Sequence, residues 1–374
     1  MTRRIVVIGG GHGIAAVLRA MRPEGAELTV IVTVADDGGS SGELRRRGAG
    51  PAVGDLRRSL VALTGDEVPL GRAFRRPVTV NGLGRHPLGN LLILSIADAF
   101  GDLARATEWL GERLGISGTV LPATAEPVSL VAEADGELIH GESAIGLAQT
   151  RIRRLRFHPE RPAIPGAALE AIDQADFVLL APGSLFTSVL AATALPDVAA
   201  ALTRTAARVV WICNLEAEMI ETAGMAGIDH LAALEDHGVR VDVALYDPRA
   251  SLKFEAQELA GRAIEPRPRS LQGHRGIHDP ALLRAELRAL LGDAAGTAGP
   301  GGQAPLPRGR YQQTERLASR FRSLRIDMNL SLLDCVQNRP GERLYSTSKT
   351  ALWAATNGLS REHSEYWKHC SSSA

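Results

Sequence analysis

The sequence predicts an α/β protein of three layers, a Rossmann-like fold in which helices cover both faces of a mostly parallel sheet. The first observation behind this prediction is a series of short, continuously apolar runs separated by helix-like stretches. Continuous hydrophobicity is typical of strands that are buried on both faces. The second observation is a pair of glycine-rich turns that directly follow the first two runs. The runs comprise residues 5–8, 28–34, 177–180, 209–213 and 239–245.

One segment departs from this pattern and predicts an added β-hairpin. Asp135 and Gly136 lie between two short apolar segments within residues 129–141. An Asp-Gly pair flanked in this way favours a tight turn between antiparallel strands. We expect the hairpin at the edge of the main sheet or projecting from it. Together with the apolar helices, it leaves a homodimer open.

The character of the chain changes near residue 292. Residues 294–307 are rich in Ala, Gly and Pro and lack periodicity, which is typical of a linker. We therefore predict a Rossmann-like nucleotide- or nucleotide-sugar-binding domain over residues 1–292 and a linker over residues 293–310. Residues 311–374 are expected to form an atypical, poorly ordered tail outside the core.

The composition argues against several classes of function. Of 374 residues, 42 are Lys or Arg and 42 are Asp or Glu, so no net charge attracts the chain to nucleic acid or to an anionic membrane. The three cysteines are too scattered for a disulfide framework or a metal-ligand spacing. No apolar run is long enough to span a bilayer, and no signal-peptide pattern opens the chain. We expect a cytoplasmic protein without nucleic-acid partners or membrane insertion.

The turn after the first run is the first candidate ligand site. Glycines allow positive φ angles and let backbone N–H groups approach a phosphate, while the following helix presents its positive end. Because Ile14 occupies the last glycine position of a G-x-G-x-x-G pattern, a tight turn without ligand is the alternative. The candidate residues are Gly9, Gly10, Gly11, His12 and Gly13.

Asp36 and Asp37 follow the second run, close to where a Rossmann acid meets a ribose hydroxyl. Neighbouring residues of an extended chain face opposite sides, so one of the two should point into the expected crevice. We choose Asp37, which would bind a ribose diol or a Mg²⁺ ion that bridges phosphates. An Asx turn without a ligand is the alternative. Gly38 and Ser40 complete this candidate site.

Two further polar residues stand at expected helix starts. Asp55 precedes a helix-like stretch, and Asn90 precedes a nearly all-apolar one over residues 91–100. Each is either a helix N-cap or a group that points into the site. If the protein is a transferase, Asp37 and Asp55 are the candidate catalytic and Mg²⁺-binding residues. Otherwise the sequence identifies no catalytic residue and no metal site, because it contains no recognisable triad or zinc-type cluster.

The run 177–180 is followed by a second small-residue turn. Such a turn at a helix N-terminus can seat an anion, whereas ordinary capping by Ser184 is the alternative. Asn214 follows the run 209–213, again at the carboxyl end of an expected strand. The candidate ligand-binding residues of this part are Pro182, Gly183, Ser184, Thr187 and Asn214.

Several strings in this order resemble one protein family. The longest is T-V-A-D-D-G-G-S-S-G over residues 33–42. The others are G-G-G-H-G-I-A-A (9–16), G-D-L-R (54–57), G-N-L-L (89–92), A-P-G-S-L-F-T-S (181–188) and N-L (214–215). They resemble the bacterial YvcK-type gluconeogenesis factors of the CofD-like superfamily, over residues 1–290. The preference for Arg over Lys is similar to that of actinobacterial members.

The resemblance implies a Rossmann-like cytoplasmic protein that binds a nucleotide sugar such as UDP-N-acetylglucosamine. Members of the family support cell shape and peptidoglycan synthesis during gluconeogenic growth, so the implied partner is a protein of cell-wall synthesis. The superfamily also includes the Mg²⁺-dependent 2-phospho-L-lactate transferase of deazaflavin coenzyme synthesis. That transferase is the alternative function, and Mg²⁺ is the one cofactor that it implies. An NAD(P)-linked oxidoreductase, with a dinucleotide ligand, is the weakest interpretation because no acid–base pair for hydride transfer is visible.

The chain departs from the family strings at three places. Arg85 stands where the family has Gly before the histidine of its G-H-x-x-G-N string. The N-L-x-x-Q-P-G-E-T string survives only in part over residues 214–222. A late R-H-D string reads Ile277, His278 and Asp279, so the arginine that would attract a phosphate is missing.

Overall fold

The computed structural model describes residues 2–293, except 23–25, 49, 81–83, 217–219, 255, 260 and 274–276. The predicted linker and tail, from residue 294 onward, lie outside the described residues. The larger compact unit comprises Met1–Pro77 and His86–Thr297, and it contains the central sheet and all the candidate site residues. Val78–Arg85 belong to a second unit, whose remaining residues lie outside the described part.

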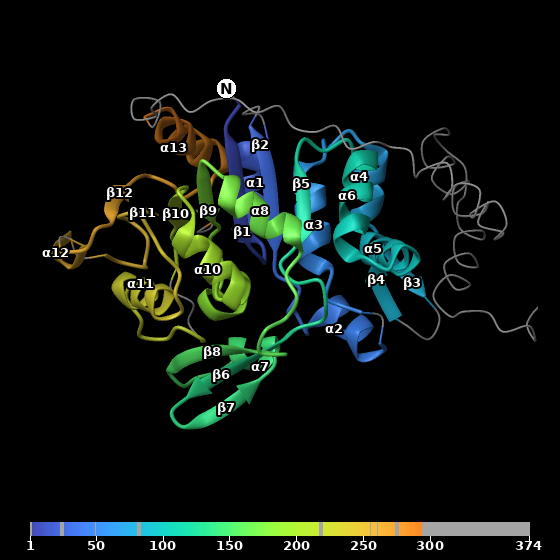
Figure 1. The fold of residues 1–374 in the computed structure, drawn as a ribbon, viewed down its shortest axis with the longest axis horizontal. Helices are drawn as coiled ribbons and strands as arrows, with labels where there is room; N and C mark the ends of the chain where they lie inside the picture. The colour runs from blue at the N-terminus through green and yellow to red at the C-terminus, as the bar shows by residue number, and fades with distance from the viewer. Residues whose placement is uncertain are drawn as a thin grey trace, which may run out of the picture. The chain divides into compact units, whose positions relative to one another are not determined.

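The centre of the larger unit is a sheet of seven parallel strands in the order β12-β11-β10-β9-β1-β2-β5 (Figure 1). The order reverses between β1 and β9, which makes these neighbours the topological switch point of a doubly wound fold. The predicted Rossmann-like sheet is confirmed. The strands are β1 (Arg4–Gly9), β2 (Glu27–Val32), β5 (Thr119–Pro122), β9 (Phe177–Leu180), β10 (Arg208–Ile212), β11 (Val243–Tyr246) and β12 (Glu265–Pro268).

Each apolar run predicted to be a strand overlaps a strand of this sheet, although only residues 243–245 of the run 239–245 belong to β11. The apolar side chains of these runs are buried because helices cover both faces, as the continuous hydrophobicity predicted. The edge strands β5 and β12 were not predicted, since both are short and β12 alternates half-buried with exposed residues. The pairing of β1 with β9 in register, from Ile5 opposite Phe177 onward, fixes the relative position of the turns that follow these two strands.

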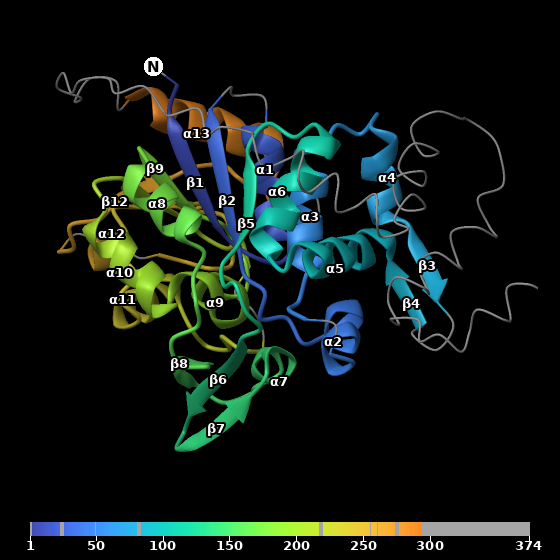
Figure 2. The same ribbon diagram turned by 45° about the vertical axis from the view of Figure 1, so that its right-hand side comes forward.

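Helices form the outer two layers. Figure 2 shows α1, α3 and α13 on one face of the sheet and α8 and α10 on the other. The helices with assigned bounds are α1 (Gly13–Met21), α2 (Gly39–Arg46), α3 (Gly54–Leu63), α4 (Pro69–Arg75), α5 (Leu88–Phe100), α6 (Leu103–Leu114), α7 (Glu142–Gly146), α8 (Gly166–Gln174), α9 (Leu190–Thr193), α10 (Pro196–Arg204), α11 (Gly227–Asp236), α12 (Ala256–Leu259) and α13 (Pro280–Asp293). A π-helical turn, η1 (Leu185–Val189), precedes α9.

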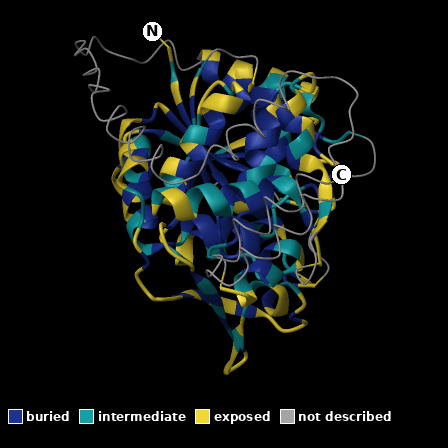
Figure 3. Cartoon of the chain, turned by 90° about the vertical axis from the view of Figure 1, so that its right-hand side faces the viewer, coloured by how far each residue is buried: buried dark blue, intermediate teal, exposed yellow. Residues whose placement is uncertain are grey.

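The predicted hairpin is present as β6 (Ser129–Ala134) and β7 (Glu137–His140). Asp135 and Gly136 both have positive φ, 47° and 88°, as a tight two-residue turn requires. A third strand, β8 (Ile152–His158), pairs with β6 and completes a separate antiparallel sheet in the order β7-β6-β8. Arg153, Arg154 and Arg156 occupy exposed positions of this strand. Figure 3 shows exposed residues along the tip of this small sheet and buried ones beside the main sheet.

The remaining strands, β3 (Pro77–Val80) and β4 (Gly84–Pro87), form a two-stranded sheet of their own. Within the described residues, no single helix is long and apolar enough to cross a membrane. Two short helical segments, Leu185–Thr193 and Pro196–Arg204, meet that test only as a pair bent by 70°.

Candidate functional site

The two small-residue turns predicted to bind phosphate meet at the switch point. A Cβ atom on Gly13 would lie 1.9 Å from the carbonyl oxygen of Pro182, so the two turns are in direct contact. A Cβ atom on Gly183 would lie 3.0 Å from the Cβ atom of Ser188. Gly11, with φ at 68°, adopts a backbone conformation that favours glycine. The glycines therefore serve the close approach of two loops from distant parts of the chain.

Two buried or half-buried side chains fix these turns. The backbone N–H of Gly11 donates to Oδ2 of Asp55 over 2.6 Å. Asn214 holds Gly183 twice, because its Oδ1 accepts the Gly183 N–H over 2.8 Å and its Nδ2 donates to the Gly183 carbonyl over 2.7 Å. Two of the amides predicted to hold phosphates thus have acceptors within the protein. The first amides of α1, beginning at Gly13, have no acceptor within their helix and remain the natural anion donors.

Asp55 is not a helix N-cap. It is the second residue of α3, where Val53 occupies the N-cap position. Its buried carboxylate forms an ion pair with Arg58 in addition to the bond from Gly11. Asn90 likewise is the third residue of α5, and Pro87 precedes that helix as its cap residue. Neither residue is therefore a cap: Asp55 bonds the glycine turn, and Asn90 bonds Arg57 and Ser40.

Asp37 joins the glycine-rich loop after β2 to the small antiparallel sheet. Its Oδ2 accepts the N–H of Glu142 and its Oδ1 accepts the N–H of Ser143, both over 2.9 Å. Asp37 therefore holds the first turn of α7, which follows β7 directly. Asp36 accepts the N–H of Gly38 over 2.8 Å, so the Asx turn weighed above is present there.

Burial raises the pKa of Asp36, and the nearby charge of Asp55 acts in the same direction. Glu142 belongs to the same group of carboxyls. Burial raises its pKa to about 7, and the charges of Asp36, Asp37 and Asp55 contribute to the shift. We call Asp36, Asp37, Asp55 and Glu142 the acidic cluster. Glu142 is a site residue that the sequence did not indicate, since no motif surrounds it.

Hydrogen bonds within the protein already orient two carboxylates of the acidic cluster. Both oxygens of Asp37 accept backbone amides, and Asp55 accepts an amide and an arginine. Within the described ranges, no group of three or more Asp, Glu, His or Cys side chains has a metal-binding arrangement. Mg²⁺ is usually held by one or two carboxylates together with substrate phosphates, and Asp36 and Glu142 are the members placed to supply them. A role for Mg²⁺ stays a prediction.

A second polar network lies beside the cluster. Asn90 Nδ2 donates to Ser40 Oγ over 3.0 Å, and Ser40 Oγ lies 2.8 Å from Nδ1 of His86. Arg57 Nε donates to Asn90 Oδ1 over 2.9 Å. Asn90 and His86 are almost completely buried, 1% and 2% exposed. Of these residues, Ser40 and Asn90 were predicted as site residues, whereas Arg57 stood out only as the last letter of the G-D-L-R string.

The remaining predicted residues occupy the same edge of the sheet. His12 is exposed at the start of α1 and makes no side-chain cap bond. Ser184 precedes η1, and Thr187 is buried within it. The structure thus brings all predicted residues to the carboxyl ends of β1, β2, β9 and β10, although none of them is thereby shown to bind a ligand.

The altered family strings have structural roles in this chain. Glu221 is buried, and its Oε1 accepts the N–H of Phe186 in η1 over 3.1 Å. His278 is buried with a hydrogen bond to the backbone of Cys213, and burial lowers its pKa to about 4. Asp279 Oδ1 accepts the amides of the first turn of α13, while Ile277 is 66% exposed. Residues 217–219 lie outside the described residues.

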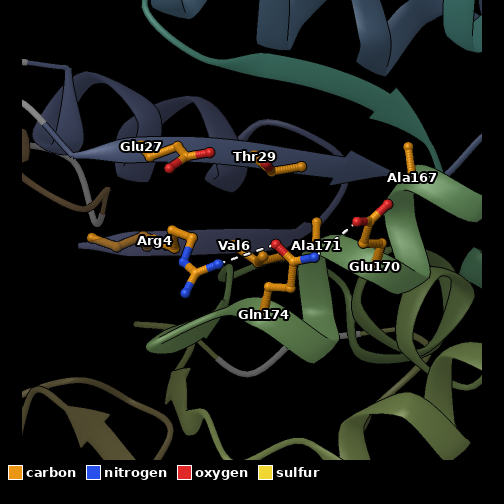
Figure 4. Close-up of a pocket in the computed structure, with 9 residues that line it drawn as sticks. Arg4, Val6, Glu27, Thr29, Ala167, Glu170, Ala171 and Gln174 are labelled. Atoms are coloured by element: carbon orange, nitrogen blue, oxygen red, sulfur yellow. Dashed lines mark hydrogen bonds between the residues drawn. The ribbon is translucent and has the colours of Figure 1, made fainter. Parts of the chain in front are cut away.

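A pocket away from the candidate site is small compared with ordinary ligand pockets. It lies between α8 and the amino-terminal parts of β1 and β2, whereas the candidate site is at the carboxyl ends of these strands (Figure 4). Arg4, Gln174 and Glu170 form a hydrogen-bonded row along it. Its volume of 170 Å³ is smaller than the several hundred Å³ of ordinary ligand pockets.

Comparison with known proteins places the chain in a family. Residues 5–263 match the model of the family described as 2-phospho-L-lactate transferase CofD. The chain belongs to the CofD family. Within that family it is 41% identical over 237 residues to the gluconeogenesis factor of Halalkalibacterium halodurans, covering 63% of this chain and 74% of that protein. It is 38% identical over 323 residues to a Mycobacterium tuberculosis protein provisionally named a gluconeogenesis factor, covering 80% of this chain and 94% of the relative.

Two further matches agree with this assignment to the family. A Deinococcus radiodurans protein, also provisionally named a gluconeogenesis factor, is 36% identical over 306 residues, or 77% of this chain and 66% of its own length. The crystal structure of a UPF0052-family protein from Bacillus halodurans superposes with a TM-score of 0.72 at 32% identity. It covers 77% of this chain and 99% of the solved chain. These matches confirm the family resemblance and the fold.

Proposed function

We propose that this CofD-family protein is a cytoplasmic regulatory protein that binds a nucleotide sugar of the UDP-N-acetylglucosamine type. The observation that carries the proposal is the direct contact between two small-residue turns at the switch point, where a Cβ atom on Gly13 would lie only 1.9 Å from the Pro182 carbonyl oxygen. In doubly wound sheets, ligands bind outside the carboxyl ends of the strands at this point. Each turn also leads into a helical segment, so positive helix ends face the same place.

The side chains around the turns suit the parts of a nucleotide sugar. The first amides of α1 would hold the diphosphate. Asp36, in the position of a Rossmann acid, and Glu142, with its pKa near 7, would accept hydroxyl groups of ribose or sugar. Ser40 and Asn90 add neutral hydrogen-bonding groups beside them. Asp37, Asp55 and Asn214 would position the backbone rather than contact the ligand.

Regulation follows from how Asp37 connects the site to the small antiparallel sheet. A ligand that orders the loop after β2 would also order α7, because Asp37 holds the first amides of that helix. The small sheet contacts a second element through Leu155, whose N–H donates to Nε2 of His237 over 2.8 Å. Ligand occupancy would shift the population of conformations that a cell-wall-synthesis partner contacts. The relatives named gluconeogenesis factors support a link to gluconeogenesis, and the role in cell shape and peptidoglycan synthesis is part of the proposal.

A Mg²⁺-dependent transferase of the 2-phospho-L-lactate type is the second candidate, because the family model carries that description. Asp37 and Asp55 would then hold the ion, and their bonds to the Glu142, Ser143 and Gly11 amides would orient the carboxylates. Substituting Asp37→Asn separates the two functions, since a transferase would lose far more turnover than affinity.

The test is calorimetric titration of the full chain with UDP-N-acetylglucosamine, with and without Mg²⁺, followed by chromatography of the ligand. We expect micromolar binding that does not require Mg²⁺ and leaves the ligand intact. Binding that depends on Mg²⁺, together with a new product, would favour the transferase. Absence of binding in both conditions would refute the nucleotide-sugar proposal.

A further inference from the structure

Arg57 is held in one orientation at the edge of the candidate site. Its Nε donates to Oδ1 of the buried Asn90 over 2.9 Å. A Cβ atom on Gly89 would come within 2.9 Å of both Cγ and Cδ of Arg57, so the arginine stem lies directly on the backbone of α5. The half-buried guanidinium is therefore fixed at its inner end by an uncharged amide and by packing.

This cation forms no direct ion pair in the part of the chain that the structure describes. The neighbouring carboxylate, Asp55, pairs with Arg58 and accepts the Gly11 amide. Arg57 makes no ion pair, and its two terminal nitrogens make no hydrogen bond to a described residue. Burial lowers its pKa to about 10, the charges of Arg58 and Arg75 act in the same direction, and the charge of Asp55 acts against them. A desolvated guanidinium without a directly bonded anion is costly, so an anion placed against its free edge would be stabilised.

Hydrogen bonds connect this guanidinium to the loop that follows β2. Asn90 accepts from Arg57 on its oxygen and donates from its nitrogen to Ser40 Oγ. Ser40 belongs to the first turn of α2, the helix that begins directly after the Asp36–Asp37 pair. Because Asp55 and Arg57 are two residues apart on α3, their side chains leave the helix in different directions. Asp55 faces the glycine turn, and Arg57 faces α5.

We propose that Arg57 binds an anionic group of the ligand, a phosphate or a carboxylate, in a subsite on the α5 side, separate from the turns at the switch point. The free edge of a guanidinium matches either group with two parallel N–H···O bonds. The proposal rests on the proposed function only in taking this edge of the sheet as the site of a nucleotide-derived ligand, and it goes beyond the ligand proposed there. UDP-N-acetylglucosamine carries no negative group besides its diphosphate, so a nucleotide-derived ligand with a second negative group should bind more tightly.

The experiment compares ligands that differ only in that group. Calorimetric titrations of the full chain would use UDP-glucuronic acid against UDP-glucose for a carboxylate, and NADP⁺ against NAD⁺ for a phosphate. We expect the unmodified chain to bind the anionic member of one pair at least tenfold more tightly than its counterpart. Whichever pair shows the preference identifies the source of the anion. In Arg57→Gln the preference should vanish, whereas the counterpart ligand binds unchanged.

Arg75→Gln is the matched control, because Arg75 contributes to the same local charge but is exposed and paired with Asp66. It should keep the preference. Arg57→Lys keeps the charge without the planar fork and should lose most of the preference, which guards against a folding defect in Arg57→Gln. A preference absent from the unmodified chain, or retained in both Arg57 variants, would overturn the proposal. This experiment does not depend on whether UDP-N-acetylglucosamine binds. The failure of one proposal can therefore be distinguished from the failure of the other.

Discussion

The turns at the switch point and the acidic loop after β2 are both rich in glycine, but different groups hold them in place. The turns are fixed by side chains that bond their backbone, Asp55 to Gly11 and Asn214 to Gly183. The acidic loop supplies its own anchor, because Asp37 reaches out to the amides of α7, 105 residues further along the chain. The turns are therefore anchored within the main sheet, and the loop is anchored to the small sheet.

This difference in anchoring predicts that the turns are rigid and that the acidic loop responds to the ligand. The turns should be among the most stable parts of the site, since their anchors are buried or half-buried and belong to the main core. The loop should move with α7, because both oxygens of the Asp37 carboxylate accept amides of that helix. A protein that reports ligand occupancy needs both parts, a fixed seat and an element of lower stability that responds.

The largest expected effect is the loss of the Asp55 anchor. Asp55→Ala removes a buried carboxylate, leaves Arg58 without its ion-pair partner and frees the Gly11 amide. We expect a loss of about 3–5 kcal/mol in the free energy of unfolding, measured by urea titration. Asp66→Ala is the control, because that carboxylate is 84% exposed in its pair with Arg75. A loss below about 1 kcal/mol for Asp55→Ala would refute the buried anchor.

Two buried histidines and the carboxyl group of Glu142 should make the free energy of unfolding respond oppositely to pH. Burial lowers the pKa of His278 and of His230 from 6.5 to about 4, so the folded chain holds both neutral. Their contribution is complete above pH 6.5 and is lost as the pH falls from 6.5 toward 4, by about 2 kcal/mol per histidine at pH 5. The raised pKa of Glu142 has the opposite sign, since its contribution is complete below pH 4.5 and is lost as the pH rises through 7.

Urea titrations between pH 4.5 and 8.5 would measure how the free energy of unfolding changes with pH for the histidines and for Glu142. Because the two pH windows overlap, Glu142→Gln should steepen the rise in the free energy of unfolding between pH 4.5 and 6.5 and remove the fall between pH 6.5 and about 7. An acid slope that disappears in Glu142→Gln would contradict this assignment of the two slopes.

The anchor at Asn214 should be somewhat weaker. Asn214→Ala removes both hydrogen bonds to Gly183 and leaves two backbone groups without these partners. We expect a loss of about 2 kcal/mol in the free energy of unfolding. Gln174→Ala, which removes hydrogen bonds of an exposed amide, should change it by less than about 0.5 kcal/mol. Equal losses in the two variants would show that the clamp on Gly183 contributes no stability of its own.

The smallest effect on global stability is expected at the acidic loop. Asp37→Ala removes the acceptor for the first amides of α7 and should cost about 1 kcal/mol. Hydrogen exchange should instead speed up locally, over residues 142–158, because α7 loses its connection to the loop. Asp173→Ala, at an exposed ion pair with Arg204, is the control. Exchange that accelerates equally across the main sheet would argue against a local anchor.

The sequence was sufficient for the parts of the fold that depend on local patterns. Continuous apolar runs predicted β1, β2, β9, β10 and β11, and the Asp135–Gly136 pair predicted the hairpin, because burial and turn geometry leave direct traces in composition. The short edge strands β5 and β12 and the longer strand β8 were missed. In β8, arginines occupy exposed positions between buried apolar residues. Because the segment is rich in charge, its alternation of buried and exposed residues was not recognised as a strand pattern.

The candidate site also has parts that the sequence predicted and parts that it did not. Small residues in the two turns were predictable, since close approach of backbones requires them. The roles of the acids were not. The sequence favoured Asp37 for the crevice, yet its carboxylate bonds α7, and Glu142 joins the acidic cluster only because tertiary pairing brings it there. Arg57 became noticeable only when the structure placed it against Gly89 and Asn90 without a carboxylate partner among the described residues.

The most direct test of the central claim is hydrogen exchange of the full chain with and without UDP-N-acetylglucosamine. We predict slower exchange in the presence of the ligand over residues 9–16 and 182–189, which form the two turns and the helical turns that follow them. We also predict slower exchange over residues 142–146, which Asp37 connects to the ligand loop. Unchanged exchange in both turns, or protection confined to the pocket beside α8, would contradict the claim that the switch point binds the ligand.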